Sequence, residues 1–166
     1  MPLQNFARTL TWPDFTPQSG ELMLGNEWAQ IHPDITFSDF QLGRVRNGVA
    51  ITDVTVNIRL IAEDCWVIDS HRNAALLRHE QVHYDIIAIS ARQFYNALVG
   101  LSARNTDALQ RRVTQLHTRL AEQARVVDER YDTLTNHGIN TSVQQAWETS
   151  VAAAKTNAHG TLANLP

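Results

Sequence analysis

Residues 73–99 read NAALLRHEQVHYDIIAISARQFYNALV and carry the strongest secondary-structure signal in the chain. Apolar side chains recur there at steps of three and four residues, no proline interrupts the pattern, and Gly100 follows as a stop signal. This spacing is typical of one long amphipathic helix. The apolar positions are Leu76, Leu77, Val82, Ile86, Ile87, Phe94 and Leu98.

The segment before this helix has a different period. Residues 49–62 read VAITDVTVNIRLIA, in which Val54, Val56, Ile58 and Leu60 alternate with polar side chains, as in a half-buried strand. Asn47-Gly48 is a turn signal, which predicts a hairpin with residues 37–45. Breakers leave room only for short strands and loops between residues 12 and 48, namely Pro13, Pro17, Gly20, Gly25, Pro33, Gly43 and Gly48.

Two more helices are expected after Gly100. The second begins at an Asn105 or Thr106 cap and ends where residues 136–138, Asn-His-Gly, break the pattern. The third begins at about Thr141, and residues 156–166 have too little periodicity to predict more than a loose tail. We therefore expect one α+β domain over residues 1–166, with a small antiparallel sheet followed by three helices. Strands and loops should fill residues 12–72, and residues 73–155 should form a helical, metal-binding part.

The composition narrows the class of function. A chain of 166 residues with 43% hydrophobic residues is expected to form a single core, and a net charge of -3 argues against binding a nucleic-acid backbone. With Cys65 as its one cysteine, the chain has no internal disulfide, and any metal would need nitrogen and oxygen ligands. No apolar run is long enough to span a membrane, and the first residues, as written, carry no export signal, as in a cytoplasmic protein. The compartment stays open, because a signal peptide removed before numbering would leave the same sequence.

Residues 79–83, HEQVH, match the H-E-x-x-H pattern inside the first predicted helix. Because four residues make just over one helical turn, His79 and His83 project from the same side and can bind one metal ion. Zinc accepts imidazole nitrogen, and it keeps a position for water when three protein ligands hold it. Glu80 lies next to this pair, where a general base would act. The competing interpretation is an ordinary helix surface with no metal.

A third ligand must come from another part of the chain. Candidates are His71, His117, His137, Glu122, Asp128, Glu129 and Asp132. We favour His137, because a helix ends there and Gly138 lets the backbone turn toward the first helix. Asp132 is the alternative ligand, or otherwise a partner that orients a ligand imidazole. Tyr131 is a candidate catalytic residue, since its phenol could donate a hydrogen bond to an oxyanion. The alternative is a core position, because this tyrosine closes an apolar stripe.

The segments LLRHEQVHYDIIAISARQF and YDTLTNHGINTSVQQAW resemble a bacterial family of predicted, often secreted, zinc-dependent proteases that is filed as a domain of unknown function. The resemblance extends over most of the chain and includes Trp12, Asp14, Phe15 and Trp66. Members tend to read H-E-Q-G-H-F-D, so this chain differs at Val82 and Tyr84 but has the two histidines and the glutamate. The resemblance implies a zincin-like metallopeptidase, includes His137 in its second block, and implies a secreted or periplasmic location.

The sequence thus predicts a zinc-dependent metallopeptidase that cleaves a peptide or protein substrate with a metal-activated water and Glu80 as general base. The peptide could add itself to an exposed edge of the small sheet. The alternative is a zinc-stabilised binding module without catalysis, in which Asp132 joins His79, His83 and His137 and closes the metal site. A further alternative is a helical interaction protein that needs no metal.

Overall fold

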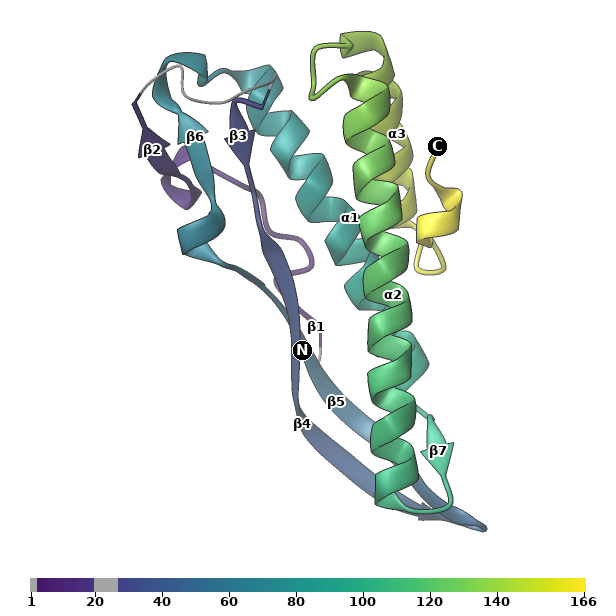
Figure 1. Cartoon of the computed structure of the whole chain (residues 1–166). Helices are drawn as coiled ribbons and strands as arrows, with labels where there is room; N and C mark the ends of the chain where they lie inside the picture. Colours follow the sequence, from purple (N-terminus) through teal and green to yellow (C-terminus); the bar gives the residue numbers. More distant parts are fainter. Residues whose placement is uncertain (1–2, 20–26) are drawn as a thin grey trace.

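The computed structural model describes residues 3–19 and 27–166 and has a single-domain α+β architecture (Figure 1). Gly20 and Gly25, two of the expected chain breakers, lie outside these residues. The helices of the described part are α1 (Ala74–Leu98), α2 (Thr106–Thr135) and α3 (Thr141–Thr156). The strands are β1 (Leu3–Gln4), β2 (Thr16–Gln18), β3 (Ala29–Gln30), β4 (Pro33–Val45), β5 (Gly48–Leu60), β6 (Trp66–Ile68) and β7 (Ser102–Ala103). Short 3-10 helices cover Trp12–Asp14, Ala62–Asp64, Asp69–His71 and Leu162–Asn164.

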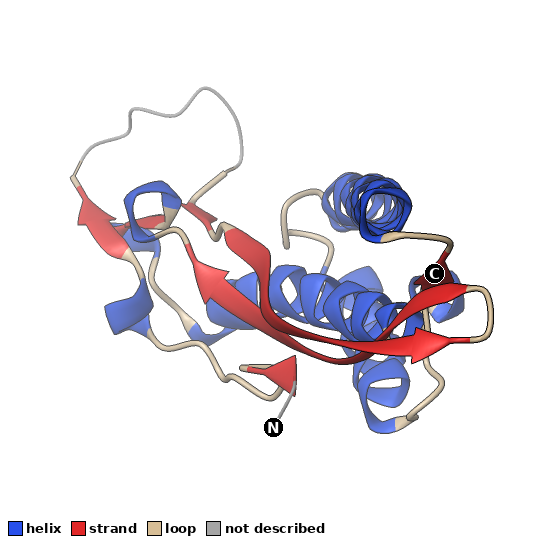
Figure 2. Cartoon of the chain, turned by 90° about the horizontal axis from the view of Figure 1, so that it is seen from below, coloured by secondary structure: helices blue, strands red, loops and turns tan. Residues whose placement is uncertain are grey.

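The predicted hairpin is confirmed, and it is longer than expected. β4 and β5 pair antiparallel from Val45↔Gly48 at the turn to Pro33↔Leu60 at the other end. The register shifts after Ser38, where Asp39 has a φ of 54°, so a bulge interrupts the ladder. Bulges increase the local twist of a strand pair, and Figure 2 shows the hairpin twisting as it passes across the helices.

The main pair of strands is antiparallel, as expected, but short strands add parallel pairs, so both sheets are mixed. β1 joins β5 in parallel, β7 pairs with the other end of β5, and a separate sheet has the order β2-β6-β3, with β2 parallel to β6. These short strands lie far from their partners in the sequence, so no turn signal announces their pairing. β3 is an edge strand, since it pairs only with β6 among the described residues.

Helix α1 is the centre of the molecule and packs against β5, α2 and α3. Asn73 caps it, as its side chain accepts hydrogen bonds from the backbone N–H groups of Ala75 and Leu76. One apolar cluster fills the space between the hairpin, α1 and the first half of α2, and a second joins α1 to the rest of α2, α3 and the C-terminal residues. No helix in the described part of the chain is long and apolar enough to cross a membrane.

The turn between α2 and α3 is formed by three consecutive residues with left-handed backbone. Their φ angles are 49° for Asn136, 51° for His137 and 84° for Gly138. Asparagine, histidine and glycine tolerate this region better than most residues, so the predicted break at residues 136–138 is confirmed. The turn directs α3 back along α1, and it keeps His137 close to the end of α2.

The C-terminal residues are packed, in contrast to the expected loose tail. Leu162 and Leu165 are buried in the second apolar cluster. The buried guanidinium of Arg92 donates hydrogen bonds to the carbonyl oxygens of Ala154 and Gly160. Apolar periodicity could not reveal this segment, because it is a single short 3-10 turn anchored from α1.

Candidate metal centre

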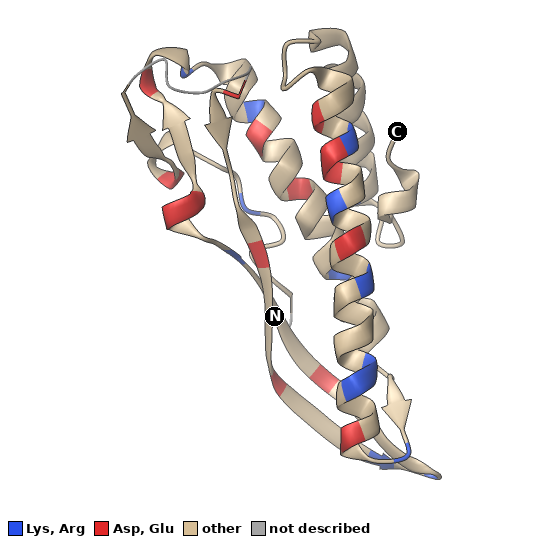
Figure 3. Cartoon of the chain, viewed as in Figure 1, with Lys and Arg blue, Asp and Glu red and all other residues tan. Residues whose placement is uncertain are grey.

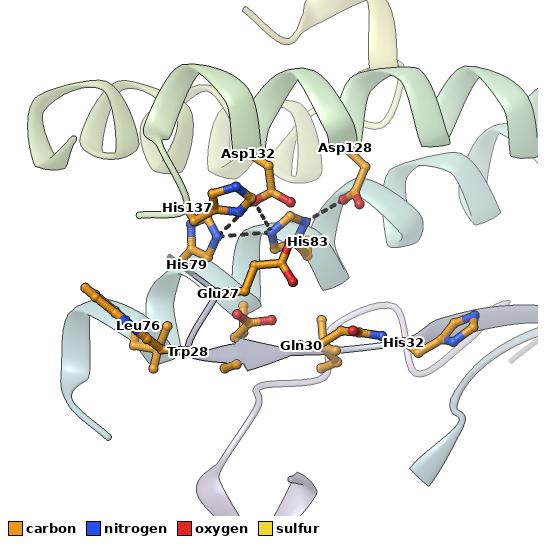
Figure 4. A pocket seen from close by; sticks show the side chains of 13 residues that line it. Glu27, Trp28, Gln30, His32, Leu76, His79, His83, Asp128, Asp132 and His137 are labelled. Atoms are coloured by element: carbon orange, nitrogen blue, oxygen red, sulfur yellow. Dashed lines mark hydrogen bonds and ion pairs between the residues drawn. The ribbon is translucent and has the colours of Figure 1, made fainter. Parts of the chain in front are cut away.

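Three donor atoms converge between α1 and α2 (Figure 4). Nε2 of His79 lies 3.2 Å from Nε2 of His83. Oδ1 of Asp132 lies 3.1 Å from the first of these atoms and 3.0 Å from the second. The two histidines come from successive turns of α1, whereas Asp132 comes from the last turns of α2. Among the described residues, His79, His83 and Asp132 thus form a group that could hold a metal ion.

The spacing and chemistry of this group fit a divalent cation. A tetrahedral ion with ligand bonds of about 2.0–2.1 Å separates its ligand atoms by about 3.3 Å, close to the observed triangle. Two imidazole nitrogens and a carboxylate oxygen are also a donor set that zinc accepts. Without a cation, the lone pairs of the three donor atoms would repel one another unless protons lie between them. The site can therefore hold either a metal ion or protons between its donor atoms.

Asp128 orients His83 from the side opposite to the triangle. Its Oδ1 lies 2.6 Å from Nδ1 of His83, so the ring can donate its Nδ1–H to this carboxylate and direct Nε2 at the site. Burial disfavours the imidazolium, but the carboxylates of Asp128 and Asp132 outweigh it and raise the pKa of His83 well above its ordinary value. The sequence named Asp128 only as a possible ligand; the structure shows that it contacts the other nitrogen of His83.

His79 is held by packing. Its ring stacks on Tyr131, with the ring centres 4.7 Å apart, and it contacts Gly138 so closely that an added Cβ would lie 3.2 Å from the imidazole. Burial lowers the pKa of His79, although the hydrogen bond with Asp132 opposes this shift. Nδ1 of His79 and Oε1 of Gln144 are both buried without a partner, and both lie next to Gly138. No sequence motif points to Gln144, because an amide at this position belongs to no recognised pattern.

Glu80 is buried beside the two histidines and is only 2% exposed. Burial raises the pKa of Glu80 to about 7, and the nearby carboxylates of Asp132 and Asp128 add to the effect. The charge of His83 and a hydrogen bond from the backbone N–H of Ile31 oppose it. A carboxyl group in this environment can accept and release a proton near neutral pH. Glu80 also links α1 to the segment that follows β3.

A pocket of about 320 Å³ lies over the triangle and is lined by α1, α2 and the β3 segment. Four carboxylate residues line it, and the described lining contains no lysine or arginine: they are Glu27, Glu80, Asp128 and Asp132. Figure 3 shows acidic positions along α1 and α2. Trp28, which directly precedes β3, stacks on His71 with the ring centres 4.6 Å apart. The pocket is therefore acidic and suited to a cation.

His137 lies at the edge of the site and outside the group of three donors. Its Nδ1 is 3.6 Å from Oδ1 of Asp132, and its side chain is 33% exposed. His137 was the expected third ligand and Asp132 its alternative. In the structure Asp132 points into the triangle, whereas His137 points at Asp132. His137 lines the pocket, where its imidazole can contact a bound molecule.

Tyr131 does not occupy the position expected of an oxyanion donor. Its side chain is fully buried, and its hydroxyl faces the backbone carbonyl of His79 at 3.5 Å. It packs between His79 and Trp147 and does not line the pocket. Burial raises the pKa of Tyr131 far above its ordinary value. We therefore correct the expectation for Tyr131: it supports the ring of His79 and belongs to the core.

Comparison with known proteins finds a family match that covers the candidate site. Residues 70–138 match a family described as "Bacterial protein of unknown function (DUF922)". The matched segment contains α1, α2 and the turn after α2, and therefore includes His79, Glu80, His83, Asp132 and His137. It is shorter than the resemblance suggested, since Trp12, Trp66 and Trp147 lie outside it. No curated protein and no solved structure matches the chain significantly.

Proposed function

We propose that this protein is a zinc-dependent metallopeptidase. One observation carries the proposal: His79, His83 and Asp132 form a ligand triangle that opens into a pocket, with a buried carboxyl group beside it. Three protein ligands that leave a position free are typical of catalytic rather than structural zinc sites. When bound, zinc would act as a Lewis acid and lower the pKa of a coordinated water.

The protein's own residues supply proton transfer and orientation. Glu80 would act as the general base and then pass the proton to the leaving amine, a role that its pKa of about 7 favours. The N–H of Ile31 holds this carboxylate in place, and Asp128 holds His83. His137 is exposed enough to donate a hydrogen bond to the carbonyl oxygen of the cleaved bond. In this proposal His137 contacts substrate, and Asp132 completes the metal site.

β3 provides an edge along which a peptide can bind. The carbonyl groups of Trp28 and His32 accept hydrogen bonds from Ile68 and Ile61, so they point away from the pocket. Because backbone groups alternate along a strand, those of Ala29 and Ile31 point the other way, toward the pocket. An extended peptide could donate hydrogen bonds to the carbonyls of Ala29 and Ile31 and lie across the metal centre, whereas the N–H of Ile31 is already bonded to Glu80.

The test combines zinc content with hydrolysis of casein by the full chain. We expect one bound zinc after dialysis and measurable casein cleavage by the natural protein. Glu80→Gln should retain zinc and lose at least about 100-fold in kcat, since it removes the proton acceptor and no ligand. His159→Ala is a matched control, because His159 is exposed near the C-terminus. Cleavage by Glu80→Gln at the natural rate would refute the role of Glu80.

A different result would support the alternative function. Zinc that binds tightly in a protein with no hydrolytic activity would favour a zinc-stabilised binding module. Loss of all zinc on dialysis would argue against both functions.

A further inference from the structure

A second pocket continues from the metal site along the cleft between β4 and α2. Its volume is about 260 Å³, and it shares Ile31, His32, His83 and Asp128 with the first pocket. The shared residues form the border between the two spaces. A peptide lying on β3 and passing His83 would therefore extend directly into the second pocket.

Most of the polar side chains that line this second pocket already have partners in the protein. Arg125 contacts Glu122 and Glu129, Asp34 contacts Arg59, and His32 contacts Asp64. Deeper in the pocket, Ser90 donates a hydrogen bond to the carbonyl of Leu120, and His117 packs between the rings of Phe37 and Phe94. The lining therefore offers a ligand little polar binding capacity.

The rest of the lining is apolar and comes from the strand, from α1 and from α2. It consists of Ile31, Pro33, Ile35, Ile87, Ala121 and Ala124. Two of the α2 positions are alanines, whose small side chains leave the space open. Burying an apolar side chain there would contribute about 25 cal/mol for each Å² removed from water. The pocket thus differs sharply from the acidic pocket beside it.

We propose that this second pocket binds a large uncharged apolar side chain of the substrate, such as leucine or phenylalanine, close to the cleaved bond. This inference rests on the proposed peptidase function. Ile31 borders both pockets, and residues 33–35, a few positions further along the chain, line only the second pocket. A strand rises about 3.3 Å per residue, so the two pockets are a few residues apart along a bound peptide. The side chain that enters the pocket therefore belongs to a residue within about two positions of the cleaved bond.

The experiment uses the zinc-loaded full chain. Mass spectrometry of casein fragments first locates the cleaved bonds. Peptides around one such bond are then varied at single positions among Gly, Ala, Leu, Phe and Asp. At one position within two residues of the bond, kcat/KM should be at least about 10-fold higher for Leu or Phe than for Gly or Asp.

Ala121→Leu tests the pocket itself, because Ala121 is exposed at its mouth and a larger side chain can be accommodated without repacking the core. We expect about a 10-fold loss of kcat/KM for the Leu and Phe peptides and less than a twofold change for the Ala peptide. Zinc content should not change. Ala153→Leu, an exposed alanine on α3, is the matched control.

The outcomes separate this inference from the proposed function. Cleavage without an apolar preference, or a preference that Ala121→Leu leaves unchanged, would overturn the second pocket as a binding site while the peptidase function stands. Absence of cleavage by the zinc-loaded natural protein would overturn the peptidase function and this inference together.

Discussion

Nε2 of His83 lies 3.0 Å from Oδ1 of Asp132, although 49 positions separate the two residues in the sequence. This contact joins α1 to the end of α2 and completes the donor triangle. In the proposed metal site, it favours Asp132 over His137 as the third ligand. The distinction can be tested, because removing a metal ligand weakens metal binding, whereas removing a nearby hydrogen-bond donor does not.

Asp132→Ala should abolish stoichiometric zinc binding, because it removes one of three protein donors. His137→Ala should retain zinc and lose turnover. The measurement is metal content by mass spectrometry after dialysis against buffer. Asp107→Ala, an exposed carboxylate at the other end of α2, should retain zinc and serves as control. Loss of zinc in His137→Ala together with retention in Asp132→Ala would reverse the assignment.

Asp128→Asn should weaken zinc binding by about 10–100-fold without abolishing it. The substitution keeps the size of the side chain but removes the charge that orients and polarises the His83 ring. Competition with a chromophoric chelator would measure the change in affinity. An affinity equal to that of the natural protein would mean that the contact between Asp128 and His83 has no influence on the metal.

Glu80→Gln should stabilise the metal-free protein at pH above 7. The folded state raises the pKa of Glu80 from 4.5 to about 7. The protonated carboxyl group therefore contributes fully to the free energy of unfolding below pH 4.5, and this contribution is lost as the pH rises through 7. A shift of this size corresponds to about 3 kcal/mol. Urea unfolding at pH 4 and pH 8 should show the two proteins converging at the lower pH and diverging at the higher one. Parallel stability curves would contradict the raised pKa.

Gly138→Ala should lower both stability and zinc affinity. Gly138 has a φ of 84°, and an added Cβ would press on the His79 ring at 3.2 Å. Gly100→Ala is a close control, because Gly100 has a φ of 85° but open space around it. Both variants should lose about 1 kcal/mol of unfolding free energy from backbone strain. Only Gly138→Ala should also weaken zinc binding; an equal effect of both on zinc affinity would remove the steric explanation.

Much of the fold could be predicted from local patterns. The period of three to four residues located α1, the alternating period located β5, and Asn73 and Asn105 marked the starts of two helices. The parallel additions of β1 and β2 could not be predicted, because their partners lie far along the chain and no turn joins them. The packed C-terminal segment escaped prediction for a similar reason, since its anchor is Arg92 on α1.

The candidate site, like the fold, has one part that the sequence determines and another that only the folded chain determines. The i, i+4 spacing of His79 and His83 is a property of one helix, so the amino-acid sequence alone was enough to put both imidazoles on one side. The third donor depends on how α2 crosses α1, and that crossing is set by packing between the two helices. Asp132 therefore points into the triangle, His137 remains at its edge and Tyr131 becomes part of the core. The depth at which Glu80 is buried, and hence its raised pKa, is likewise a result of the β3 segment covering α1, which only the folded chain defines.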